Sequence, residues 1–289
     1  MPRELDLPRS ESELNELFLS SAAYRNSAEF AKMMRFIARR SRIAPFNAYL
    51  LYIQKPDIVF AASRTEWSAE GRSLKEGARP LIILKPFAPV EFVYDAQDTE
   101  GLGDFDAEAM DNWKSKGIVS ESEIAGIVAN MEAAGLCMDP LDLKELKLRY
   151  RVPVPFVQAR RDQGRRLQGL RPGAGKKDLP AFFEALANEY ARHLLGHVGS
   201  WSVEINGKSY AVCDRDRSDL DKDEKEWEAA CVAHIVCGRV GIDRPLDASA
   251  LKPRVDFFAV LAASNKVLKG FSLPKGPELP SDGLQLLLF

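Results

Sequence analysis

Three histidines and four cysteines in 289 residues leave this chain with few of the side chains from which metal sites and disulfides are built. No two cysteines have the C-x-x-C spacing that is typical of zinc and redox sites, so we expect reduced thiols without a disulfide framework. No apolar run approaches the roughly 20 residues that a membrane-spanning helix needs. Because residues 1–6 are polar and unlike a secretion signal, we expect a protein of the cytoplasm that does not enter a membrane.

The chain also lacks a large excess of either charge. Its net charge of −2 argues against a protein that is basic throughout, although a local basic face is compatible with it. A hydrophobic content of 46% and a charged content of 28% are ordinary for a soluble globular protein, and the length suits one large domain or two modest ones. Composition therefore leaves both an enzyme and a binding protein open.

Helical and strand patterns are interleaved along the chain, which predicts an α+β fold. Apolar residues at helical spacing predict helices over 11–41, 46–52, 179–194, 227–240 and 255–268, and a less regular helical region over 100–145. Strands are predicted at 58–61, 81–84, 90–94, 146–150 and on both sides of Asn206-Gly207, a dipeptide typical of a two-residue hairpin turn. Thr65 is expected to cap a short helix through Trp67, and 214–226 to form a charged linker.

The segment 188–197, Asn-Glu-Tyr-Ala-Arg-His-Leu-Leu-Gly-His, has the frame of the H-E-x-x-H helix of zinc peptidases but lacks both histidines of that motif. In the intact motif the two histidines hold Zn²⁺ on one helix face and the glutamate activates the metal-bound water. Asn188 and Arg192 stand at the two histidine positions. Because Asn binds zinc poorly and a guanidinium repels a dication, only Glu189 remains, as a vestigial general base.

The histidines that the chain does have lie close to this segment, which leaves two interpretations. In the first, Glu189, His193 and His197 follow one another at intervals of four residues and form a displaced zinc site. In the second, the histidines pack in the core. The leftover carboxylates then need a counter-charge, which Arg192 supplies by pairing with Glu189 or Glu228, unless it extends into solvent instead. The second interpretation is favoured, and with it the expectation that no cofactor binds unless zinc occupies the displaced site.

Basic residues in the first third of the chain lie near aromatic ones. Proteins that bind single strands combine a cationic groove with aromatic side chains on which bases stack. Composition alone favours a plainer interpretation, in which the aromatic side chains are core and the charges are solvated. The candidate contacts are Arg64, Trp67, Arg72, Lys75 and Arg79.

Two groups of motifs resemble known families. The first comprises 45–51 (PFNAYLL), 66–77 (EWSAEGRSLKEG) and 94–101 (YDAQDTEG). It resembles the N-terminal domain of ArdC-type antirestriction proteins, with departures at Gln97 and Asp98. That domain binds single-stranded DNA. The resemblance therefore implies the same activity here, with the segment around Trp67 in the binding surface.

The second group combines 186–197 with 228–241 (EAACVAHIVCGRVG). It resembles the zincin-like metallopeptidase domain shared by ArdC-type and ImmA/IrrE-type proteins, in which a second helix supplies the third zinc ligand. The resemblance places Glu228 at that ligand position. Together with Asn188 and Arg192, Glu228 marks a degenerate metal site.

The two resemblances imply how the chain is divided and what it does. The implied segments are an ArdC-like module that binds single-stranded DNA (1–105), a connecting region with a basic loop (106–178), a degenerate zincin-like domain (179–270) and a tail (271–289). The implied protein binds nucleic acid, carries an inactive peptidase domain, and is associated with antirestriction or with mobile elements. One alternative is a metallopeptidase with a displaced site formed by Glu189, His193, His197 and Glu228. The other is a module that binds a protein partner without catalysis.

Overall fold

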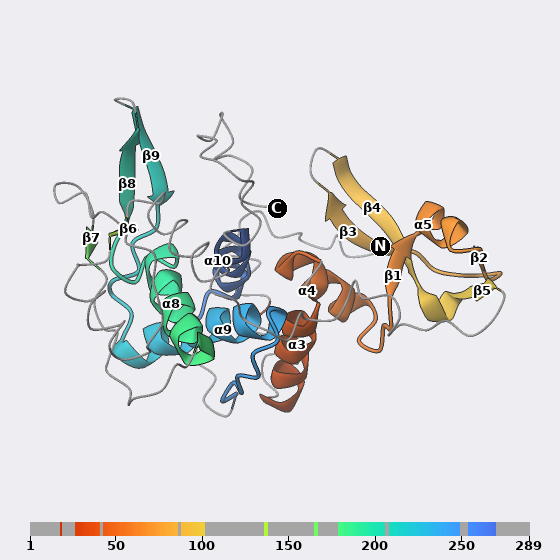
Figure 1. The fold of residues 1–289 in the computed structure, drawn as a ribbon, viewed down its shortest axis with the longest axis horizontal. Coiled ribbons are helices and arrows are strands. Elements are labelled where there is room, and N and C mark those ends of the chain that lie inside the picture. Colours follow the sequence, from red (N-terminus) through yellow and green to blue (C-terminus); the bar gives the residue numbers. More distant parts are fainter. Residues whose placement is uncertain are drawn as a thin grey trace, which may run out of the picture.

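The computed structural model describes residue 18 and residues 27–40, 43–85, 88–101, 136–137, 165–166, 179–205, 208–248 and 254–269. Figure 1 shows an elongated arrangement, with a small sheet at one end, helices in the middle and a β-hairpin at the other end. Helices and small antiparallel sheets together make the α+β fold that the sequence predicts. Of the helices in these ranges, none has the length and apolar character needed to cross a membrane.

The larger hydrophobic core lies between the helices. These are α3 (Ser27–Arg39), α4 (Pro45–Gln54), α8 (Leu179–Leu194), α9 (Lys222–Arg239) and α10 (Phe257–Lys269). Helix α9 is central, because it packs against α3, α8 and α10. Gly238 lets α3 approach it closely, since a Cβ there would lie 2.7 Å from the Cβ of Ala38. Helices from the front and the back of the chain therefore share one core.

Helix α9 begins five residues earlier than the sequence suggests. Its start was predicted at Trp227, but the helix begins at Lys222. Asp221 caps it by accepting the N–H of Glu224 at 2.7 Å, while the Glu224 carboxylate accepts the N–H of Asp221 at 3.2 Å. This reciprocal capping box satisfies two donors of the first turn. The segment interpreted as linker over 214–226 is therefore helical in its second part.

The small sheet lies at the end of the molecule opposite the hairpin (Figure 1). Its antiparallel strand order is β1-β4-β3, and β2 pairs with β5 beside it. The strands are β1 (Ala61–Ser63), β2 (Arg72–Leu74), β3 (Leu81–Lys85), β4 (Ala88–Asp95) and β5 (Thr99–Gly101), joined by α5 (Arg64–Ala69) and η1 (Ala96–Asp98). A second hydrophobic core, which contains Trp67 and Phe60, covers this sheet.

The remaining strands form two short pairs. Strand β8 (Trp201–Ile205) pairs antiparallel with β9 (Lys208–Cys213), as the Asn206-Gly207 signal predicts. Strand β6 (Leu136–Cys137) pairs in parallel with β7 (Arg165–Arg166). The predictions for the rest of 102–178, including the strand at 146–150, and for the tail fall outside the described residues.

Two details of the sheet correct the predictions. The strand expected at 58–61 lies at Ala61–Ser63 instead. The reason is that the N–H groups of Val59 and Phe60 both donate to the Asp95 carboxylate, at 3.1 Å each, and not to a neighbouring strand. The cap of α5 is Ser63, not Thr65, because Ser63 forms a capping box with Glu66.

Side-chain amides of α4 cover the free edge of β3. Asn47 accepts the Leu84 N–H and donates to the Leu84 carbonyl, at 2.9 Å each. Gln54 makes the same pair of bonds with Ile82, at 2.8 Å each. These two amides, two helical turns apart, take the place of a fourth strand. They protect an edge that otherwise invites pairing with another chain.

The two amides differ in exposure, which allows a matched test. The bonds of Asn47 are partly buried and those of Gln54 are exposed to solvent. We expect Asn47→Ala to lower the free energy of unfolding by about 1–3 kcal/mol, because it leaves partly buried backbone groups unsatisfied. Gln54→Ala should cost about 0.5 kcal/mol or less, since water replaces its bonds. Urea unfolding measures both, and equally small losses would show that the clamp does not stabilise the fold.

Candidate functional site

The site that the zincin motif predicts is centred on a buried carboxylate in α9. Glu228 has no solvent exposure. Its Oε2 lies 2.6 Å from Nη1 of Arg217 and 2.7 Å from Nε2 of His197, and its Oε1 accepts the backbone N–H of Asp256 at 2.6 Å. Three donors therefore converge on one carboxylate, from the ends of α8 and α10 and from the loop before α9. A buried charge requires this degree of satisfaction.

His197 faces Glu228 as a neutral imidazole. Burial lowers the pKa of His197, while the hydrogen bond to Glu228 raises it and the charges of Arg217 and Arg192 lower it further. A carboxylate only accepts hydrogen bonds, so the Nε2 of His197 carries the proton and donates it. The full positive charge in contact with Glu228 is therefore that of Arg217, whose side chain is 16% exposed.

Residues 214–220, which we call the strap, bring the Arg217 side chain into contact with Glu228. The strap crosses the end of α8, where the backbone N–H of Arg217 donates to the Gly196 carbonyl at 3.0 Å. Gly196 has a φ of +76°, and a Cβ there would lie 2.5 Å from the Arg215 carbonyl oxygen. Any other residue would push the strap away. Arg217 Nη2 also donates to the Arg254 carbonyl at 2.8 Å, which fixes the guanidinium from its far side.

Glu189, the candidate general base, lies within α8. Glu189 and His193 are both buried, and their side chains approach to 3.7 Å between Oε1 and Nε2. Each of the two carboxylates thus has a histidine beside it, Glu189 in its own helix and Glu228 across the helix pair. Within the described ranges, no group of three or more His, Cys, Asp or Glu side chains is arranged to hold a metal ion.

The predicted role of Arg192 is wrong. No contact of Arg192 with Glu189 or Glu228 is found among the ion pairs of the described residues, and the cation on Glu228 is Arg217. Arg192 is close enough to lower the pKa of His197. The buried Nε atom of Arg192 has no hydrogen-bond partner among the described residues. The Arg192 and Asn188 side chains are both partly buried. The predicted counter-charge to the buried carboxylate is present, but Arg217 in the loop before α9 supplies it.

The part of the site that sequence reasoning missed comes from outside the motif. Arg217 lies 11 residues before Glu228, and Asp256 lies 28 residues after it. The only signal for Arg217 was the density of charge between α8 and α9, which was interpreted as a linker. No sequence signal marks the backbone N–H of Asp256, because every residue except proline carries a backbone N–H.

The predicted nucleic-acid contacts lie at the other end of the molecule, and they differ in burial and in hydrogen bonding. Trp67 is fully buried and donates its indole N–H to the Tyr94 carbonyl at 2.9 Å. Its predicted role as a stacking platform is therefore wrong, since its faces pack in the core against Phe60. Arg72 is partly buried and donates to the Thr99 hydroxyl at 2.8 Å, so it links β2 to β5. Lys75 is exposed but donates to the Gln97 carbonyl at 2.8 Å.

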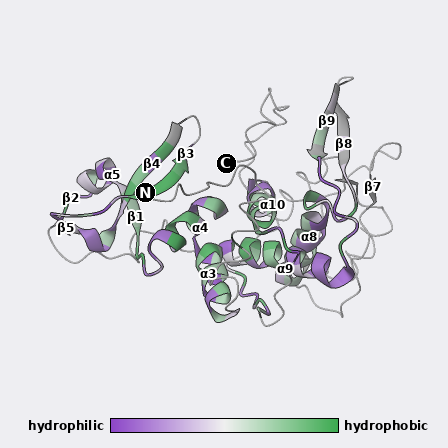
Figure 2. Ribbon diagram, turned by 180° about the vertical axis from the view of Figure 1, so that it is seen from behind, coloured by the Kyte–Doolittle hydropathy of each residue, from purple (hydrophilic) through white to green (hydrophobic). Residues whose placement is uncertain are grey.

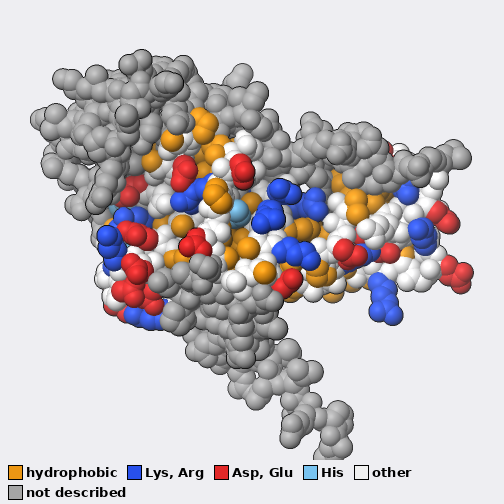
Figure 3. Space-filling model, turned by 90° about the horizontal axis from the view of Figure 1, so that it is seen from below, with side chains coloured by type: hydrophobic (Ala, Val, Ile, Leu, Met, Phe, Trp, Pro, Cys, Tyr) orange, Lys and Arg blue, Asp and Glu red, His pale blue; other side chains and the backbone are white. Residues whose placement is uncertain are grey.

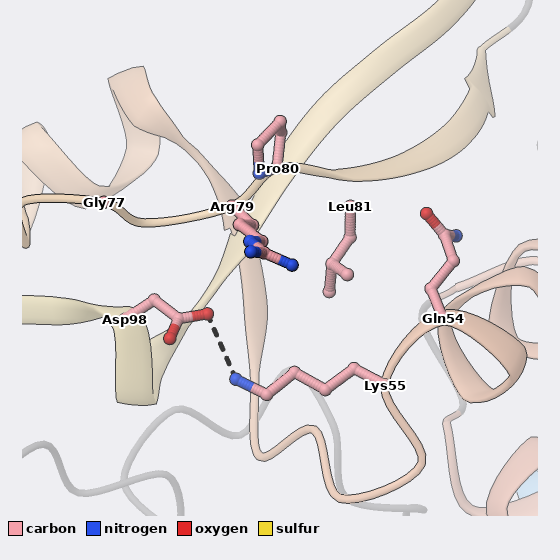
Figure 4. Close-up of a pocket in the computed structure, with 7 residues that line it drawn as sticks. All are labelled: Gln54, Lys55, Gly77, Arg79, Pro80, Leu81 and Asp98. Atoms are coloured by element: carbon pink, nitrogen blue, oxygen red, sulfur yellow. Dashed lines mark hydrogen bonds and ion pairs between the residues drawn. The ribbon is translucent and has the colours of Figure 1, made fainter.

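The remaining two candidates are exposed cations. Arg64 and Arg79 are exposed, and within the described part of the chain neither forms an ion pair. Arg79 lines a pocket of about 510 Å³ together with Lys55 and Asp98. Lys55 extends toward Asp98 along one side of this pocket and Arg79 lies on the other (Figure 4), with 3.0 Å between Lys55 Nζ and Asp98 Oδ2. Lys55 also pairs with the buried Asp95 at 2.8 Å, so one lysine serves two carboxylates.

The distribution of charge over the surface is uneven. Figure 3 shows one face of the molecule, on which a group of Lys and Arg side chains gathers near the middle and Asp and Glu side chains lie toward both ends. A net charge of −2 therefore coexists with locally basic areas.

Comparisons of the chain with protein-family models, with curated proteins and with solved structures found no match. The resemblance to ArdC-type and ImmA/IrrE-type proteins rests on the motifs quoted above and stays a prediction.

The contact between Arg217 and Glu228 predicts a stability difference between two neighbouring arginines. We expect Arg217→Ala to lower the free energy of unfolding by about 2–4 kcal/mol, because it strands a fully buried carboxylate. Arg215→Ala is the control on the same strap. Arg215 pairs with Asp256 at 2.8 Å, but the two side chains are 37% and 24% exposed, so its loss should be below about 1 kcal/mol.

Thermal and urea unfolding measure both variants, with Arg192→Ala beside them. Arg192→Ala should cost less than Arg217→Ala, since the Arg217 pair remains. A loss from Arg192→Ala that exceeds the loss from Arg217→Ala would return the counter-charge role to Arg192.

Proposed function

We propose that this protein binds single-stranded nucleic acid through its N-terminal part and that its helical part is the scaffold of a zinc peptidase without the metal chemistry. The second half of the proposal, the absence of metal chemistry, rests on the contacts of Glu228. A zinc ligand must offer a free lone pair at the metal, and the Glu228 oxygens already accept from Arg217, His197 and the Asp256 N–H. The Arg217 guanidinium supplies the positive charge beside Glu228.

The residues present do not fit a zinc ion. Three protein ligands are needed, and Asn188 and Arg192 replace two of them. His193 and His197 are both taken up in contacts with carboxylates, at 3.7 and 2.7 Å. Glu189 would act as a general base only on a water held by a metal, so we assign it no catalytic step. This supports a binding protein over a metallopeptidase with a displaced site.

The first half of the proposal rests on the sequence motifs and on charge. The three motifs that resemble the single-strand-binding module surround the small sheet, where Arg64, Lys75 and Arg79 are exposed. Exposed cations around a sheet attract a phosphate backbone, and their affinity comes from the release of counterions. Antirestriction or another role tied to mobile elements is the biological setting that the motifs suggest.

A protein-interaction module remains the second candidate, because one observation favours it. Three large hydrophobic side chains of the small sheet, Ile82, Val90 and Phe92, are exposed, and so is Ile53 of the neighbouring helix α4. Exposed apolar groups of this kind are also a feature of surfaces that bind proteins. Nucleic-acid binding separates the two candidates.

Binding of the full chain to a labelled oligothymidylate, measured by fluorescence anisotropy at several salt concentrations, tests the proposal. We expect binding at low salt that is tighter than binding to duplex and that falls steeply as salt rises. Replacing both Arg64 and Arg79 by Ala should reduce the slope of log K against log salt by about 1–2, since each phosphate contact contributes about 0.7.

The matched control replaces two cations that the structure already commits to other partners, Lys85 and Arg215. This variant should keep the slope of the natural protein. No detectable binding of the natural protein at low salt would refute the proposal and move the protein-interaction candidate to first place.

A further inference from the structure

Helix α3 carries a row of basic side chains on its exposed side. Lys32, Arg35 and Arg39 are all exposed, and spacings of three and four residues place them along one side of the helix over about 10 Å. The opposite side of α3 is buried in the larger core. Within the described part of the chain none of the three side chains forms an ion pair. We call Lys32, Arg35 and Arg39 the cationic row.

The members of the cationic row lie beside other basic groups. Burial lowers the pKa of Arg40 to about 10, the charge of Asp95 raises it, and the charge of the adjacent Arg39 lowers it. Burial also lowers the pKa of His234 in α9, and Arg35 is close enough for its charge to lower it further. The row therefore continues into basic groups at both the end of α3 and the neighbouring helix.

A buried cation lies close to the end of the row. Arg239 of α9 is 4% exposed and donates to the Ile43 carbonyl, while its Nε and Nη2 atoms have no hydrogen-bond partner. Burial lowers its pKa to about 9, so the guanidinium is charged at neutral pH. The preceding residue, Gly238, packs against Ala38 of α3. Among the described residues no carboxylate pairs with Arg239, so its charge adds to the positive potential here.

The N-terminal part of the chain has its excess of positive charge on this helix. Residues 27–40 carry four Lys and Arg side chains against one acidic side chain, whereas residues 55–101 carry six against eight. The one acid of α3, Glu29, accepts the Tyr52 hydroxyl at 3.4 Å. Figure 2 shows hydrophilic and hydrophobic positions alternating along α3, and Figure 3 views the molecule from the side on which α3 lies in Figure 1. A polyanion that approaches the N-terminal part is therefore attracted to α3.

The chemistry of the row favours a phosphate chain over a protein partner. None of the exposed large hydrophobic side chains of the described residues belongs to α3. Protein interfaces usually have an apolar centre inside a polar rim, and this side of α3 has no such centre. A phosphate chain requires only cations, and the planar guanidinium of arginine matches the oxygens of a phosphate.

We propose that the cationic row of α3 binds successive phosphates of the single-stranded nucleic acid. The inference rests on the proposed function and goes further, because it adds a contact surface on a helix, outside the quoted motifs and apart from the small sheet. Contacts to phosphates carry no sequence information, so the contribution of the row is independent of base sequence and is screened by salt.

The test uses the double variant Arg35→Ala/Arg39→Ala in the full chain, with a labelled oligothymidylate as the probe. The slope of log K against log salt should fall by about 1.4, since each of two phosphate contacts contributes about 0.7. This change corresponds to roughly 25-fold weaker binding at about 0.1 M salt, relative to about 1 M salt, where counterion release contributes little. Because both side chains are exposed, thermal unfolding should be unchanged.

Two further variants distinguish a local contact from a change in overall charge. Arg35→Lys/Arg39→Lys keeps both charges and should keep the slope of the natural protein. The double variant Lys85→Ala/Arg215→Ala loses the same number of charges as the α3 variant, but at positions that already pair with Glu91 and Asp256. It should also keep the natural slope.

The outcomes separate the inference from the function on which it rests. If the natural protein binds and Arg35→Ala/Arg39→Ala keeps its slope and affinity, the inference is overturned and the proposed function survives. An equal loss in Lys85→Ala/Arg215→Ala overturns it too, because overall charge then explains the effect. If the natural protein does not bind, both fall. Tighter binding of polyglutamate than of oligothymidylate, lost in the α3 variant, would assign the row to an acidic protein instead.

Discussion

The helical part of this protein depends on one buried carboxylate, Glu228, and on the need to balance its charge. A carboxylate with no solvent exposure costs several kcal/mol unless it is paired and hydrogen-bonded. Three segments meet that need: the end of α8 with His197, the strap with Arg217, and the start of α10 at Asp256. The positive φ of Gly196 follows from the same requirement, because the strap must pass against the end of α8 to bring Arg217 into contact.

This constraint bears on the proposed loss of peptidase chemistry, because the carboxylate that the motif offers as a metal ligand is already paired with an arginine. The Arg217 guanidinium joins Glu228 of α9 to the strap that precedes this helix. An arginine keeps its charge at every accessible pH and presents several donors in a plane, so it stabilises the carboxylate without activating water. Under the proposed function the binding surface lies at the small sheet, where Arg64 and Arg79 are exposed and where Asn47 and Gln54 cover the edge of β3.

The sequence predicted the helices well where apolar residues recur at helical spacing, as in α4, α8 and α10. It predicted that a counter-charge was needed, but placed it at Arg192, because only residues within the motif were considered. The correct residue, Arg217, is positioned by chain path and by a glycine conformation, neither of which periodicity encodes. The prediction for Trp67 was wrong for a related reason. A tryptophan in a short amphipathic helix is buried or exposed according to what packs on it, and the partner, Phe60, lies in a segment interpreted as a strand.

The most direct test of the central claim is elemental analysis of zinc in protein purified without added metal, performed on the natural protein and on Arg217→Ala. We predict no stoichiometric zinc in the natural protein, because Asn188, Arg192 and Arg217 leave no ligand set around Glu228. We predict none in Arg217→Ala either, since two ligand positions are still missing. About one tightly held zinc per chain in the natural protein would contradict this prediction and establish a displaced metal site.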